Sequence, residues 1–132
     1  MSSIKCIHVV KETTPSEHLF TNVETGEHYS WETLPVGAIY LEPIPYKYHN
    51  GMGIGLDGQS VVVRTPGGFW NIDSRASNCG RSEDDTHRCW IRHGEIPNIT
   101  VDKNGDTCNA GAGSISIGGY HGFLRDGYLV DA

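Results

Sequence analysis

The chain has 132 residues, of which 17 are glycine and 37% are hydrophobic, and its formal net charge is −6 at pH 7. This length is typical of one domain, and the many glycines favour short strands and turns over long helices. The acidic balance argues against binding to nucleic acid, which usually needs a basic surface, and no apolar run approaches the length of a membrane span.

The first third of the chain predicts four short strands. The run IKCIHVV, residues 4–10, has the apolar alternation of a strand. HLFTNV and HYSW, residues 18–23 and 28–31, predict a hairpin around the turn ETGE. Residues 38–41 predict a fourth strand.

An aromatic edge follows this strand. Pro43 and Pro45 keep the chain extended and away from the centre of a sheet, because neither can donate a ladder hydrogen bond. The aromatic side chains here either pack on the core or form a recognition surface for a protein partner. The candidate partner-binding residues are Trp31, Tyr40, Tyr46 and Tyr48.

The middle of the chain combines a loop with a hairpin. Residues 49–58, HNGMGIGLDG, predict a mobile glycine-rich loop, whose glycine spacing does not match a dinucleotide fingerprint. SVVVRT and FWNI, residues 60–65 and 69–72, are joined by the letters PGG and give the strongest hairpin signal in the chain.

The last third predicts further short strands, and Asp126-Gly127 is a favoured two-residue hairpin turn. The predicted strands are 88–93, 98–101, 114–117, 120–125 and 128–130. We therefore predict a mainly β fold, one small domain of short antiparallel strands and hairpins with long loops. Its parts are N-terminal strands with the aromatic edge (1–48), the mobile loop (49–58) and a Cys/His-containing β core (59–132).

Three cysteines and two histidines of this core are candidate metal ligands. Thiolate and neutral imidazole are the usual ligands of zinc, and a structural site takes four of them in a tetrahedron. If residues 87–92 form a strand, the side chains of His87 and Cys89 point to the same face, because they are two residues apart. The candidates are Cys79, His87, Cys89, Cys108 and His121. We predict that four of them bind a structural zinc ion that pins the domain.

Other interpretations of these residues remain open. The spacing contains no C-x2-C pair, so it matches no familiar zinc finger. Five candidates for four positions also mean that at least one lies elsewhere, and His87 and Cys89 are the two that the strand argument could turn away. The cysteines could instead be unligated core residues or form a disulfide. The N-terminus carries no signal-peptide pattern, which predicts a reducing cytosol, where bridged cysteines are rarer than free, metal-bound or catalytic ones.

Two enzymatic alternatives use the same side chains. Cys108, His121 and Asp73 could form a thiol nucleophile with its base and orienting acid, although no known local signature surrounds Cys108. A metal-dependent hydrolase would need an open coordination position and a general base. The candidate bases are Asp73, Asp102, Asp106 and Glu95.

Several motifs in residues 56–130 together resemble one protein family. They are IDSRASNC, HRCW, VDKNG-TC-AGAGSI and YHGFLRDG. The chain resembles a family of small uncharacterised proteins of tailed bacteriophages, prophages and their hosts. More distantly its tail resembles a broader bacterial family, from which it departs by lacking a cysteine before His121. The resemblance implies a phage setting and no particular activity.

Together these observations predict a phage-associated, non-enzymatic binding or structural protein with a structural zinc site. It would be a virion accessory or capsid-decorating protein, or a factor that binds a host protein. We expect it in the cytoplasm of the bacterial host or in the virion. The small metal-dependent hydrolase is the alternative.

Overall fold

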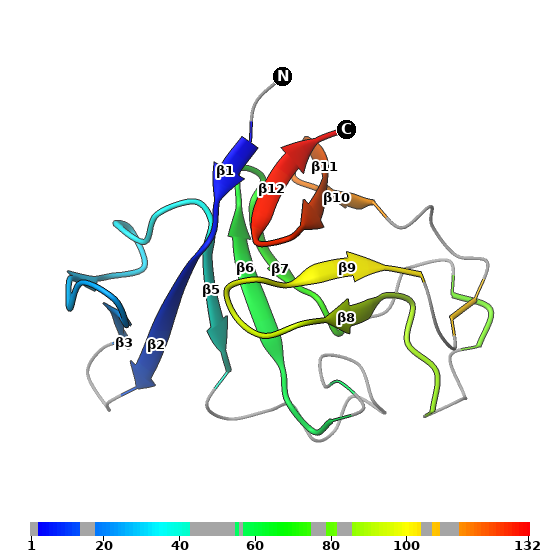
Figure 1. Ribbon diagram of the computed structural model, residues 1–132, viewed down its shortest axis with the longest axis horizontal. Helices are drawn as coiled ribbons and strands as arrows, with labels where there is room; N and C mark the ends of the chain where they lie inside the picture. Colours follow the sequence, from blue (N-terminus) through cyan, green and yellow to red (C-terminus); the bar gives the residue numbers. More distant parts are fainter. Residues whose placement is uncertain are drawn as a thin grey trace.

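A computed structural model describes residues 3–13, 18–42, 55, 57–74, 79–81, 86–103, 107–108 and 114–132. Every regular element in these ranges is a β-strand (Figure 1). The mainly β prediction is therefore confirmed. Most of the predicted mobile loop, together with Tyr46 and Tyr48, lies outside the described residues.

The larger sheet of the described residues has six strands. Its order is β4 (His28–Tyr29), β3 (His18–Asn22), β2 (Ile7–Thr13), β5 (Ala38–Leu41), β6 (Val61–Thr65) and β7 (Gly68–Asn71). Pairing is antiparallel except between β2 and β5, where Ile7 lies opposite Ala38 in a parallel register. The predicted hairpin of residues 60–72 forms, with Val63 opposite Trp70.

The second sheet contains the two ends of the described chain. Its order is β1 (Ser3–Lys5), β12 (Tyr128–Asp131), β11 (Tyr120–Arg125) and β10 (Ile115–Ile117). A separate ribbon pairs β8 (Ile91–His93) with β9 (Thr100–Asp102), and β9 contacts β11. Figure 1 shows this ribbon beside the β10–β12 strands.

The core lies on both faces of β6. Val61 and Val63 pack on one face with residues of the second sheet and the ribbon, including Leu124 and Val101. Val62 points to the opposite face, into a smaller cluster around Phe20 and Tyr40. Because successive side chains of a strand alternate between faces, the continuous apolar run VVV reads as a strand buried on both sides.

Some predicted boundaries hold and others fail, among them the single strand expected over residues 4–10, which is divided into β1 and β2 at Cys6. Strands 38–41 and 120–125 form over those residues, and the Asp126–Gly127 turn has positive φ angles of 48° and 79°, as a type I′ hairpin requires. The strand considered over residues 87–92 is wrong for residues 87–90, because β8 begins only at Ile91.

Candidate metal centre

Four side chains from three separate segments gather at one point. They are Cys79, His87, Cys89 and Cys108, and their ligand atoms all lie within 4.8 Å of one another. His87 and Cys89 are fully buried, whereas Cys79 and Cys108 are half-buried. These three segments contain no regular strand at the cluster, so tertiary packing brings the ligands together.

The distances match a tetrahedron around one ion. Zinc bonds of about 2.3 Å to sulfur and about 2.0 Å to nitrogen place two sulfurs about 3.8 Å apart, and a sulfur and a nitrogen about 3.5 Å apart. The Sγ atom of Cys108 lies 3.8 Å from that of Cys89 and 3.9 Å from that of Cys79. Nε2 of His87 lies 3.2 Å from Cys79 Sγ and 4.0 Å from Cys89 Sγ. The group can therefore hold a metal ion with little rearrangement.

Hydrogen bonds orient this group. The backbone N–H of Arg81 donates to Cys79 Sγ over 3.4 Å. The Arg81 guanidinium donates to the carbonyl of Thr107 over 3.0 Å, which ties the Cys79 segment to the Cys108 segment. Nε2 is the ring atom of His87 that faces the sulfurs. Nδ1 is buried and has no hydrogen-bond partner among the described residues.

His121 is not part of the group, which corrects one expected ligand. Its side chain is exposed, and Nε2 lies 3.0 Å from Ser114 Oγ. On β11 the side chain of Leu124 points to the core, so alternation turns His121 and Arg125 to the outer face. The strand that was expected to bring His121 to the metal therefore carries it away, while His87 and Cys89 both belong to the site.

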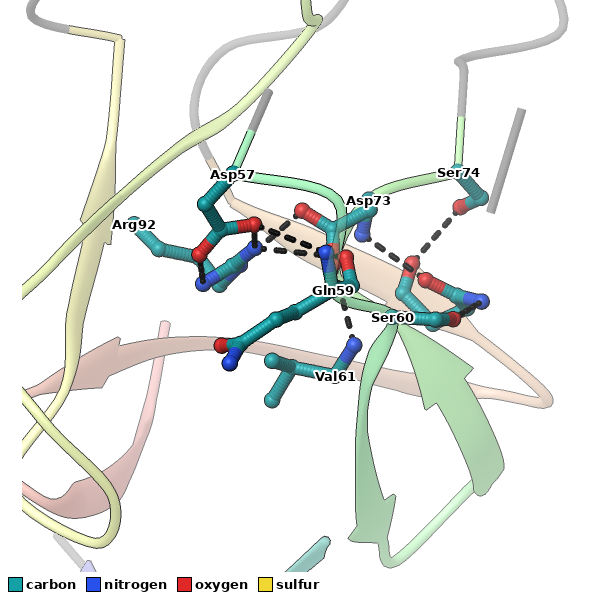
Figure 2. A network of polar contacts seen from close by, with 8 residues as sticks. Asp57, Gln59, Ser60, Val61, Asp73, Ser74 and Arg92 are labelled. Atoms are coloured by element: carbon teal, nitrogen blue, oxygen red, sulfur yellow. Dashed lines mark hydrogen bonds and ion pairs between the residues drawn. The ribbon is translucent and has the colours of Figure 1, made fainter. Parts of the chain in front are cut away.

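The acidic candidates that the structure describes also lie outside the four-residue group. Asp73 is buried and accepts hydrogen bonds from Arg92 Nε over 2.9 Å and from the Val61 N–H over 3.0 Å (Figure 2). Burial raises the pKa of Asp73, although the charge of Arg92 and the bond from Val61 oppose this. Asp102 pairs with His93 over 2.8 Å, and Asp106 lies outside the described residues.

Sequence patterns did not indicate the network that holds the ribbon next to the metal group. Arg92 also pairs with Asp57, at 2.8 Å (Figure 2). Burial favours a raised pKa for Asp57, but the hydrogen bonds and charge of Arg92 outweigh it and the pKa is lowered. The indole of Trp90 meets Trp70 edge to face, with ring centroids 5.6 Å apart. These contacts of Trp90 and Arg92, one and three residues after Cys89, hold the start of β8 against the large sheet.

Of the expected partner-binding residues that the structure describes, one lies at the surface and one is buried. Trp31 is 37% exposed and lies at the surface. Tyr40 is only 2% exposed, so the expectation of an exposed anchor there is wrong. Tyr40 sits on β5 between β2 and β6, and its ring packs against Phe20.

Comparisons with known proteins find no match for this chain. No protein family, no curated protein and no solved structure matches it. Among the described residues, no helix is long and apolar enough to cross a membrane.

Proposed function

We propose that this chain is a non-enzymatic binding or structural protein whose β domain is held together by a structural zinc ion. Cys79, His87, Cys89 and Cys108 are the proposed ligands. The observation that carries the proposal is the closed set of four ligand atoms at tetrahedral spacing.

The ligand types favour zinc. Three thiolates and one imidazole form one of the usual ligand sets of structural zinc sites, whereas calcium and magnesium prefer oxygen ligands. A hydrolytic zinc keeps one position open for water. Here four protein ligands fill the tetrahedron, and no acidic side chain of the described part of the chain belongs to the group. The same geometry therefore speaks against the hydrolase alternative.

The proposed setting is a tailed bacteriophage or prophage, and the support for it is the motif resemblance alone. In that setting the protein would decorate the virion or bind a host protein, in the host cytoplasm or on the particle. The exposed ring of Trp31 supports a binding role, because aromatic side chains often anchor interfaces. Detection of the protein in purified particles would support a virion role, and its confinement to the lysate would contradict that role.

Elemental analysis of the purified protein tests the metal. We expect one zinc per chain, and a cobalt-substituted protein with the absorption bands of a tetrahedral thiolate site. The variant Cys108→Ser should lose metal affinity, because it removes one of four ligands, and a chelator should lower the thermal midpoint of the wild type.

His121→Ala is the matched control, since this histidine was a candidate from the sequence and lies outside the group. It should keep full zinc content. A protein without bound metal that is indifferent to chelation would overturn the structural zinc, as would loss of metal in His121→Ala with retention in Cys108→Ser.

A further inference from the structure

A groove of about 420 Å³ lies on the face of the large sheet that points away from the second sheet. Its lining includes the rings of Trp31, Tyr40 and Phe69 and the polar groups of Lys11, Glu42 and Asn71. Small-molecule sites typically have volumes of about 300–1,000 Å³, mostly apolar walls and a few convergent polar groups. The groove has both the size and the composition of such a site.

Trp31 forms a prearranged aromatic platform in this groove. Its ring makes edge-to-face contacts with Phe69, Phe20 and His18, with centroid distances of 4.9, 5.0 and 5.3 Å. More than a third of the residue nevertheless stays open to solvent. A ring that is held in place before binding loses little conformational entropy when a ligand packs on it.

An ion pair supplies the polar groups beside this platform. Lys11 Nζ lies 2.7 Å from Glu42 Oε1, and the two side chains are only 6% and 14% exposed. The ammonium also lies 4.9 Å from the centroid of the Trp31 ring. An ammonium has three N–H donors and a carboxylate has about four acceptor positions, so their mutual bond uses a fraction of both.

The charge and hydrogen-bonding pattern select the ligand class. Lys11 and Glu42 cancel in charge, which favours neither an anion such as phosphate nor a polyamine. A hydroxyl group donates and accepts at once, so neighbouring hydroxyls can bridge an ammonium and a carboxylate. A buried ion pair adds little stability compared with apolar residues of similar volume, so stability alone does not explain this pair.

We propose that the groove binds a neutral saccharide. One apolar face of a sugar ring would pack on Trp31, and adjacent hydroxyls would bond to Lys11 and Glu42. This inference rests on the binding role proposed above and names its ligand class. It does not depend on the metal.

The test is a titration of the full-length protein with neutral sugars, followed by NMR of the three tryptophan indole N–H signals. The panel contains glucose, galactose, mannose, N-acetylglucosamine, maltose, lactose and chitobiose, and Trp31→Phe assigns the signal of Trp31. At least one sugar should shift that signal saturably, with a dissociation constant of about 1 mM or tighter. Glu42→Gln should weaken this binding by about tenfold or more at the Trp31 signal. Trp31→Ala lacks that signal, so its affinity is measured by isothermal titration calorimetry, and we expect a loss of about the same factor.

Tyr128→Ala is the matched control, because it removes an exposed aromatic ring on β12, outside the groove. It should bind the sugar like the wild type. If circular dichroism shows that Trp31→Ala is unfolded, Glu42→Gln carries the test.

The proposal is overturned if no sugar of the panel binds saturably, or if Glu42→Gln binds as tightly as the wild type. Binding of inorganic phosphate or of a proline-rich peptide at Trp31, without any sugar, overturns it as well. Zinc content measured on the same preparation separates the two proposals, since the structural metal can be present whatever the groove binds.

Discussion

Arg92 compensates a buried carboxylate, so replacing it with methionine should destabilise the protein strongly. Methionine keeps much of the aliphatic packing of the arginine stem and removes the charge. It leaves Asp73, whose side chain is 4% exposed, without its cation. Removing one partner of a buried ion pair costs about 3–5 kcal/mol. The Val61 N–H still satisfies one carboxylate oxygen, so we expect about 3 kcal/mol, near the lower limit.

Asp57→Asn is the matched control within the same network. Its side chain is 49% exposed, and ion pairs at such positions contribute about 0–1 kcal/mol. Asp73→Asn should partly rescue Arg92→Met, because asparagine can still accept the bond from Val61 and carries no charge. Urea unfolding followed by tryptophan fluorescence measures the two single variants, Arg92→Met and Asp57→Asn, and the double variant Arg92→Met/Asp73→Asn. In thermal melts, a loss of about 3 kcal/mol corresponds to a midpoint lower by about 10 °C for a domain of this size.

The deficit of Arg92→Met should also depend on pH. Burial already raises the pKa of Asp73, and the variant loses the charge and hydrogen bond of Arg92 that oppose this. Its Asp73 therefore takes up a proton at a higher pH than in the wild type. The deficit should be full at neutral pH and shrink as the pH falls through this raised pKa. Equal losses in Arg92→Met and Asp57→Asn, or a deficit unchanged in acid, would refute the assignment of the cost to a buried charge.

Two further predictions concern the β core. A Cβ atom at Gly67 would overlap the carbonyl oxygen of Ile117, so Gly67→Ala should lower the free energy of unfolding in urea by about 1–3 kcal/mol. The control is Gly80→Ala, whose methyl group enters open space and should leave stability unchanged. Similar values for both variants would contradict the close approach of Gly67 to Ile117. Burial raises the pKa of Cys6 from 9.0 to about 12. Between these values the thiol ionises in the unfolded chain alone, so stability falls as pH rises, by about 1.4 kcal/mol at pH 10 from this group. Cys6→Ala should lose that part of the alkaline decline between pH 8 and pH 10, and an unchanged decline would contradict the burial effect.

Local sequence patterns determined much of the secondary structure. Strands 38–41 and 120–125 and the Asp-Gly turn follow from alternation and turn chemistry, which act over a few residues. Side-chain chemistry also sufficed to select cysteine and histidine as the candidate ligands, four of which the structure brings together. These features depend on neighbours in the chain, so a sequence displays them directly.

Tertiary structure alone decided which candidates meet. His121 was excluded by the face on which β11 packs, and His87 and Cys89 were included without the strand that was expected to align them. The pairing of Arg92 with Asp57 spans 35 residues, and Lys11 with Glu42 spans 31. No local pattern encodes such pairs. The pairing of β2 with β5 inside one sheet brings Lys11 beside Glu42, and the packing of the β8–β9 ribbon against the large sheet brings Arg92 beside Asp57.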